Sequence, residues 1–211
     1  MKAFDTTLYF ITDSTPYTEE EFLFRTEEAL KGGATIIQLR EKNRTTREYI
    51  NLAEKVHKIT RRYNIPLIID DRIDVAMAVK SEGVHLGQSD MPVKIARSIL
   101  GNDFIIGATT KTVSQAVEAY EQGADYCGVG AIFPTTTKVK TVLTSTKTLS
   151  EICQAVPIPV NAIGGLNKTN LSVLEGIKIS GICIVSAIIH AKNPKEETEI
   201  LLSMAKKLIQ N

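Results

Sequence analysis

The chain has 211 residues, of which 43% are hydrophobic and 23% are charged, a balance typical of a globular protein with one large core. Its 25 basic and 24 acidic side chains leave a formal net charge of +1. The composition therefore excludes a strongly basic nucleic-acid binder and a polybasic membrane-surface protein, and any anion site must come from a local cluster.

The N-terminal stretch and the cysteines favour a reduced, cytoplasmic setting. The first residues, MKAFDTTLYFITD, lack the apolar stretch and cleavage site of a secretory signal, and no run approaches the ~18 apolar residues of a membrane span. Cys127, Cys153 and Cys183 are odd in number and lack CxxC spacing, which argues against a disulfide framework or a zinc knuckle. Cys127 and Cys183 lie in apolar runs, where we expect buried thiols.

Short apolar segments recur along the chain and are predicted to be strands. They are continuous runs rather than alternations, as is typical of parallel strands that are covered on both faces. The predicted strands are Leu8–Thr12, Thr35–Arg40, Pro66–Asp70, Gly83–Gly87, Phe104–Thr109, Tyr126–Phe133, Pro159–Gly164 and Gly181–Ile188.

Segments with helical periodicity separate these strands. The predicted helices are Glu19–Lys31, Thr46–Tyr63, Asp74–Lys80, Val93–Leu100, Thr112–Gln122, Thr146–Ala155, Lys168–Glu175 and Lys195–Gln210. Eight strands, each followed by a helix, predict an α/β protein with a single (β/α)8 TIM barrel over residues 1–211. A doubly wound sheet is less favoured because TDSTP, after the first strand, lacks a glycine-rich phosphate turn.

Basic and acidic side chains follow the second, third and fourth strands, where this fold places active sites. Gln38, Arg40 and Lys42 alternate with apolar or acidic neighbours, so these three donors face the same way and suit phosphate oxygens. The carboxylates of Asp70–Asp71 and Asp90 follow the next two strands and suit Mg²⁺ that bridges to phosphate. Alternatively, Asp70 or Asp71 caps the helix that begins near residue 73.

Hydroxyls and glycines follow the later strands. Thr109 ends the fifth strand, Thr135–Lys138 follows the sixth, Gly165 the seventh, and Val185 and Ser186 end the eighth. Glycine allows a backbone to approach a ligand closely, and these last loops often build the phosphate site of such barrels. The sequence thus predicts two anion pockets. It offers no obvious pair of nucleophile and base.

The histidines are not favoured as catalytic groups. His57 lies on the apolar side of its predicted helix, His85 lies within a strand, and His190 follows the last strand.

Several motifs occur in one order from the first strand to the last, and together they are specific. The set resembles the thiamine-phosphate synthase family. The motifs that carry the resemblance are QLREK (Gln38–Lys42), DDR (Asp70–Arg72), GVHLGQSD (Gly83–Asp90), ADYCGVGAIFPTTTK (Ala124–Lys138), AIGG (Ala162–Gly165) and VSAI (Val185–Ile188).

The resemblance implies a transferase that joins a hydroxymethylpyrimidine diphosphate to a hydroxyethylthiazole phosphate and releases pyrophosphate. It implies one Mg²⁺ per subunit on Asp71 and Asp90, and charge stabilisation by Arg40, Lys42 and Lys138 as pyrophosphate leaves before the thiazole nitrogen attacks. The implied pyrimidine diphosphate site comprises Gln38, Leu39, Arg40, Glu41, Lys42, Asp70, Thr109 and Lys138. The implied thiazole phosphate site comprises Thr135, Thr136, Thr137, Gly165, Val185 and Ser186.

Two departures from the family pattern bear on the pyrimidine contacts. Asp70 stands where the family more commonly has Asn, and Ala108–Lys111 reads ATTK where a Ser is usual. The alternatives are a thiazole tautomerase on a related barrel and a non-catalytic binder of thiamine phosphate or pyrophosphate. The expected partners are small-molecule substrates, with neither nucleic acid nor membrane, and a homo-oligomer is left open.

Overall fold

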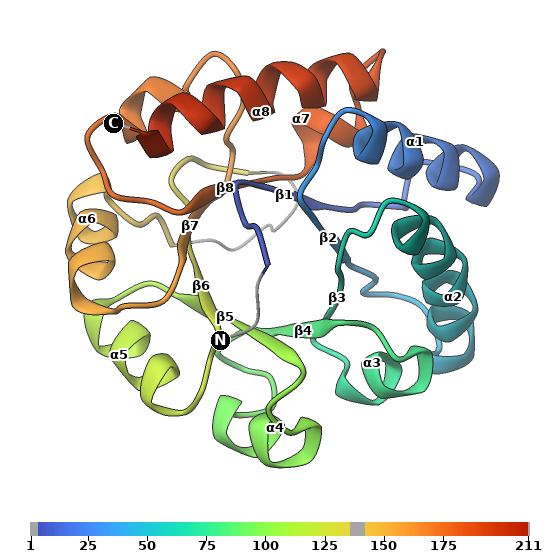
Figure 1. Ribbon diagram of the computed structural model, residues 1–211, viewed down its shortest axis with the longest axis horizontal. Coiled ribbons are helices and arrows are strands. Elements are labelled where there is room, and N and C mark those ends of the chain that lie inside the picture. Colours follow the sequence, from blue (N-terminus) through green and yellow to red (C-terminus); the bar gives the residue numbers. More distant parts are fainter. Residues whose placement is uncertain (1–3, 136–141, 211) are drawn as a thin grey trace.

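The computed structural model describes residues 4–135 and 142–210. Its strands form a closed barrel in which each strand pairs in parallel with its sequence neighbours, and the first pairs with the last (Figure 1). The predicted (β/α)8 barrel is therefore confirmed. The strands are β1 (Leu8–Ile11), β2 (Ile36–Leu39), β3 (Leu67–Asp70), β4 (Gly83–Leu86), β5 (Ile105–Thr110), β6 (Tyr126–Gly130), β7 (Val160–Ile163) and β8 (Gly181–Ile184).

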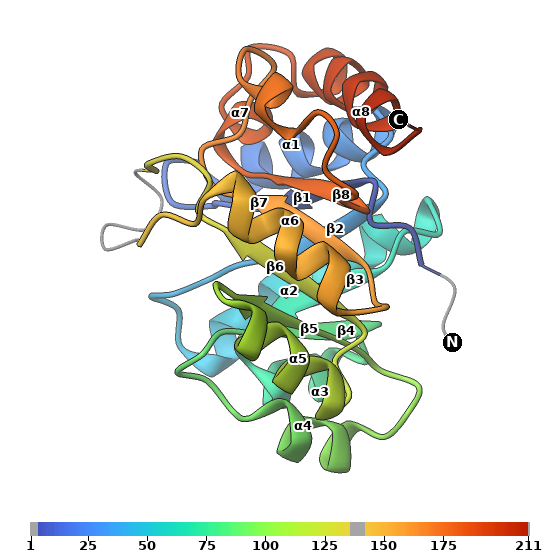
Figure 2. The same cartoon turned by 90° about the vertical axis from the view of Figure 1, so that its left-hand side faces the viewer.

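Helices surround the barrel (Figures 1 and 2). They are α1 (Glu19–Lys31), α2 (Thr46–Arg62), α3 (Ile73–Val79), α4 (Val93–Leu100), α5 (Val113–Glu121), α6 (Thr146–Ala155), the 3₁₀ turn η1 (Leu171–Leu174), α7 (Ser186–Ile189) and α8 (Pro194–Gln210). Hydroxyl side chains start several of them: Thr45, for example, begins α2 in a reciprocal capping box with Glu48. Within the described residues, no helix is long and apolar enough to cross a membrane.

Three predicted elements differ from the structure by more than two residues or in kind. The predicted strand Tyr126–Phe133 ends at Gly130. The segment Gly181–Ile188 leaves the sheet after Ile184 and forms the short helix α7, because an apolar run alone does not distinguish a strand from one buried helical turn. The predicted helix Lys168–Glu175 is only the 3₁₀ turn η1. Asn170 closes a tight turn before it, where its side chain accepts from the Asn167 N–H at 2.9 Å.

The barrel wall separates two apolar layers. Side chains alternate along each strand, so that Ile36 and Gln38 point inward while Ile37 and Leu39 pack against the helices. The larger layer lies between strands and helices. The smaller cluster fills the barrel, and its members are Tyr9, Ile11, Ile36, Ile68, Ile105, Tyr126 and Cys183. Inward positions beyond this cluster are polar, which places the site above it.

Candidate active site

A cavity of about 620 Å³ opens where the strands end. It gathers most of the residues singled out from the sequence, because parallel strands bring their carboxyl ends to one mouth of the barrel. The predicted residues that line it are Gln38, Arg40, Lys42, Asp70, Asp71, Asp90, Thr109, Thr135, Gly165, Val185 and Ser186. A second, more open hollow of about 970 Å³ lies beside α1, α7 and α8 and shares Ser186 with it.

Some predicted residues do not meet in this cavity. Leu39 is fully buried in the outer apolar layer. The Glu41 carboxylate accepts from Arg44 Nε at 2.9 Å, away from the lining residues. Contact of these two residues with the diphosphate stays a prediction. Thr136, Thr137 and Lys138 lie outside the described residues.

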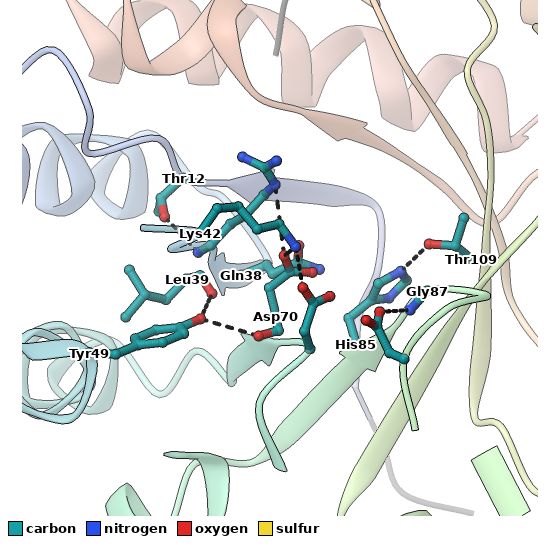
Figure 3. Close-up of polar contacts among 12 residues, drawn as sticks. Thr12, Gln38, Leu39, Lys42, Tyr49, Asp70, His85, Gly87 and Thr109 are labelled. Atoms are coloured by element: carbon teal, nitrogen blue, oxygen red, sulfur yellow. Dashed lines mark hydrogen bonds and ion pairs between the residues drawn. The ribbon is translucent and has the colours of Figure 1, made fainter. Parts of the chain in front are cut away.

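A cationic and anionic cluster forms one wall of the cavity (Figure 3). Lys42 Nζ lies 2.7 Å from Asp70 Oδ2 and also contacts the Asp71 carboxylate, while Arg40 Nε lies 3.7 Å from Asp70. Asp70 is only 7% exposed. Burial, and then repulsion from Asp71, raises the pKa of Asp70 to about 6 despite the opposing charge of Lys42. Arg40 and Lys42 therefore do not fully offset the cost of ionising Asp70 beside Asp71.

Asp71 and Asp90 face each other from neighbouring loops. Burial opposes the ionisation of Asp71, but its hydrogen bond with Lys42 outweighs this and lowers its pKa. Burial, followed by a hydrogen bond with Asp71, raises the pKa of Asp90. Asp90 Oδ2 also accepts from the Gly87 N–H at 2.6 Å, which fixes its direction. Two carboxylates this close repel each other when both are ionised, and a bound cation would reduce that repulsion.

This donor set fits Mg²⁺. Among residues 4–135 and 142–210, no three His, Cys, Asp or Glu side chains converge as a closed all-protein metal cage would need. Mg²⁺ instead takes one or two carboxylates and completes its shell with water and phosphate oxygens. The alternative role for Asp70 and Asp71 as helix caps is wrong, because Arg72 occupies the cap of α3 and no side chain there makes a capping hydrogen bond.

The opposite wall is built from backbone. Gly164 and Gly165 have φ values of 103° and 65°, which glycine adopts readily. The Phe133 N–H donates to the Gly164 carbonyl at 3.0 Å and joins the loops after β6 and β7. Asn170 Nδ2 donates to the Gly165 carbonyl at 2.9 Å and holds the end of this turn. These hydrogen bonds hold the turn at Gly165, where the sequence predicts a phosphate pocket.

Sequence reasoning missed five polar residues that line the cavity, namely Tyr9, His85, Gln88, Ser89 and Lys111. His85 was not favoured because it lies within a strand. The alternation of side chains along a strand could have identified it. Gly83, His85 and Gly87 lie on the same face of the strand, and that face is the barrel interior. Neither of the other two histidines lines this cavity: His57 contacts Glu82, and His190 contacts Tyr17.

The cysteines behave as expected from the sequence. Cys127 and Cys183 are buried, and all three cysteines are free thiols. Burial raises the pKa of Cys127 to about 11, so it stays a thiol near neutral pH.

Comparison with known proteins identifies the family. A family profile described as thiamine monophosphate synthase matches residues 8–188. The chain belongs to the thiamine monophosphate synthase family. The thiamine-phosphate synthase of Methanobrevibacter smithii is 48% identical over 202 residues, which cover 96% of this chain and 96% of that protein. Thiamine-phosphate synthase 2 of Streptococcus pneumoniae is 48% identical over 92% of this chain and 93% of that protein.

Solved structures agree with this membership of the thiamine monophosphate synthase family. The thiamine phosphate pyrophosphorylase of Pyrococcus furiosus superposes with a TM-score of 0.88 at 38% identity, and the match covers 96% of each chain. A 3-hexulose-6-phosphate synthase, at 12% identity and a TM-score of 0.69 over 94% of this chain and 99% of that one, shares the fold alone. The resemblance read from the ordered motifs is thus confirmed, as is the enzyme class, a transferase of thiamine biosynthesis.

Proposed function

We propose that this cavity condenses 4-amino-2-methyl-5-(diphosphooxymethyl)pyrimidine with 4-methyl-5-(2-phosphooxyethyl)thiazole to give thiamine phosphate and pyrophosphate. One observation carries the assignment of the two ends. Arg40, Lys42 and the Asp71–Asp90 carboxylates occupy one wall, and the glycine turn at Gly165 with Ser186 occupies the other. The first wall suits a diphosphate with its metal, and the second suits a monophosphate held by backbone N–H groups.

The reaction exchanges one bond for another. The bond between the pyrimidinylmethyl carbon and the bridging oxygen breaks, and its electron pair leaves with the diphosphate. The lone pair of the thiazole nitrogen then forms the new C–N bond. Arg40 and Lys42 stabilise the charge that develops on the leaving group, and the glycine wall positions the thiazole. Mg²⁺, when held by Asp71 and Asp90, would neutralise further charge on the diphosphate oxygens.

Lys42 suits this role because it remains a cation. Burial alone would lower the pKa of Lys42, but the charge and hydrogen bond of Asp70, with those of Asp71, outweigh burial and raise it. The reaction needs no proton transfer at the reacting carbon. The proposal therefore assigns no proton transfer to the Thr109 hydroxyl or to the His85 imidazole, whose Oγ1 and Nε2 atoms lie 2.9 Å apart in the lining.

The test is an assay with both substrates and Mg²⁺ that measures thiamine phosphate and pyrophosphate. We expect both products from the wild type, and losses in turnover of about 10²–10³ in Arg40→Ala and in Lys42→Ala, the size typical of one lost electrostatic stabiliser. Lys58→Ala, at an exposed position on α2, is the matched control and should keep wild-type turnover.

Failure to form either product by a folded protein that binds both substrates would overturn the synthase assignment. Conversion of the thiazole alone would support a tautomerase, and tight binding of thiamine phosphate without turnover would support a non-catalytic binder. The composition further supports a cytoplasmic location and partners limited to small molecules, and we infer both.

A further inference from the structure

A chain of hydrogen bonds crosses the floor of the cavity. Gln38 Nε2 donates to Tyr9 Oη at 2.9 Å, and Tyr9 Oη lies 2.7 Å from Tyr126 Oη. Tyr126 Oη lies 3.0 Å from His85 Nδ1, and His85 Nε2 lies 2.9 Å from Thr109 Oγ1. The five residues come from five strands, and Figure 3 shows Gln38 on one side of the site and the His85–Thr109 contact on the other. We call this series of hydrogen bonds, from Gln38 to Thr109, the floor relay.

The barrel is shaped to admit this relay. Tyr9 and Tyr126 are 1% and 0% exposed. A Cβ atom at Gly107 would lie 2.1 Å from Tyr126 Cζ, and one at Gly128 would lie 3.3 Å from His85 Cε1. Glycine at these two positions is therefore what makes room for the phenol and imidazole rings. The rings of Tyr9 and Tyr126 also meet edge to face, with centroids 5.7 Å apart.

Each phenol in the relay carries one proton. Burial raises the pKa of both Tyr9 and Tyr126 well above the ordinary value, so neither ionises near neutral pH. A phenol hydroxyl donates one hydrogen bond and accepts others. The order of donors along the relay can therefore be worked out by counting protons.

The count starts at Gln38, whose amide nitrogen can only donate. Tyr9 Oη accepts that bond, so its own proton goes to Tyr126. Tyr126 in turn directs its proton to His85 Nδ1, which must be unprotonated to accept it. The opposite order would leave the buried Tyr9 proton without an acceptor in the relay, which is unfavourable for a buried hydroxyl. His85 therefore carries its proton on Nε2 and donates to Thr109 Oγ1.

We propose that Tyr9, Tyr126 and His85 are positioning residues that fix the Thr109 hydroxyl as a hydrogen-bond donor toward the cavity. Thr109 Oγ1 already accepts from His85, so its single proton is available to a ligand that lies against it. Such a donor matches a ring nitrogen that bears a lone pair, as in an aminopyrimidine. It mismatches the corresponding oxopyrimidine, whose ring nitrogen at that position carries a proton. This specificity rests on the proposed function; the direction of the relay does not.

The first experiment reads the His85 tautomer directly. ¹⁵N NMR of the imidazole in the wild-type protein should show a protonated Nε2 and an unprotonated Nδ1. Tyr126→Phe removes the donor to Nδ1 and should give a mixture of tautomers. Tyr9→Phe leaves His85 Nδ1 as the acceptor for the Tyr126 proton in the relay, so this variant should keep the wild-type tautomer. Tyr63→Phe, whose hydroxyl contacts Glu27 on the outer surface at 2.9 Å, is the control and should leave the spectrum unchanged.

A proton on Nδ1 of the wild-type ring would overturn the direction of the relay. A wild-type spectrum in Tyr126→Phe would overturn the role of Tyr126, and a mixture of tautomers in Tyr9→Phe would overturn the order of donors. The wild-type spectrum remains the test if Tyr126→Phe does not fold. These results are obtained without substrate. They are therefore independent of whether the condensation occurs.

The second experiment measures binding of the aminopyrimidine diphosphate and of its oxo analogue by calorimetry. Thr109→Val should weaken binding of the amino compound about tenfold, the value of one lost neutral hydrogen bond, and Thr109→Ser should recover most of it. The preference for amino over oxo should fall in Thr109→Val and in Tyr126→Phe. An unchanged preference in both would overturn the specificity role, and a wild type that binds neither compound would instead contradict the proposed function.

Discussion

Asp70 carries its charge in a place where burial and a neighbouring carboxylate both oppose ionisation. Its pKa rises from 3.8 to about 6, so between these values the folded protein holds a proton that the unfolded chain has lost. Stability therefore falls as the pH rises through that window, and above it the ionised carboxylate opposes folding. An Asn at this position would avoid this penalty. This chain retains a carboxylate that contacts Lys42.

Asp70→Asn should stabilise the metal-free protein, and only at the higher pH. In denaturant titrations with a chelator, the variant should match the wild type near about pH 4 and exceed it by about 2–3 kcal/mol near about pH 8. The exposed Asp103→Asn is the control and should show no such difference. A gain of equal size at both pH values would show that the effect comes from packing rather than from the charge of Asp70.

At the scale of elements, the loops after β6 and β7 depend on one another. Gly165 has a φ of 65°, and a Cβ atom there would lie 2.7 Å from both Phe133 Cβ and the Pro134 carbonyl oxygen. Glycine is therefore required at position 165 for two reasons, the positive φ and the close approach of the neighbouring loop. Gly176 isolates the first reason, because its φ is 78° but a Cβ atom there would have open space.

Gly176→Ala should lose about 1–2 kcal/mol of stability from its left-handed backbone alone. Gly165→Ala should lose more, because Phe133 and Pro134 must also move, and it should weaken binding of the thiazole phosphate. Thermal unfolding and calorimetry measure the two effects. Equal losses in the two variants, with unchanged thiazole affinity in Gly165→Ala, would show that the two loops are not coupled at this contact.

At the scale of the whole molecule, the cavity is lined by residues from both ends of the barrel sequence. Its lining comes from residues as far apart in sequence as Tyr9 and Ser186, and β1 meets β8 to close the ring. A ligand that binds only the closed barrel therefore stabilises the complete fold, by RT ln(1 + [L]/Kd).

Mg²⁺ and pyrophosphate together should raise the unfolding temperature by about 5–10 °C at about one hundred times the dissociation constant. Either component alone should have a much smaller effect, since the anion and the cation each complete the site for the other. Asp71→Asn and Asp90→Asn should lose the Mg²⁺-dependent part, whereas Asp103→Asn should keep it. A full shift with pyrophosphate and a chelator would contradict the proposed metal site.

The local sequence determined the order of strands and helices and most of the cavity lining. Apolar runs and helical periodicity are properties of adjacent residues, and a parallel barrel then fixes which strand ends meet. The pleat placed Gln38, Arg40 and Lys42 together, as the sequence predicted. The same alternation would have predicted that His85 points inward, because Gly83 and Gly87, two residues before and after it, lie on the inward side of β4.

Only the tertiary structure decided which polar groups touch inside the barrel. Tyr9 and Tyr126 are 117 residues apart, and their contact depends on the register that closes the ring and on the missing side chain of Gly107. The raised pKa of Asp70 likewise depends on burial and on the nearness of Asp71 and Lys42, which no residue spacing encodes. The sequence alone determined the fold and its family; three-dimensional closure decided the charge state of the site and the direction of the relay beneath it.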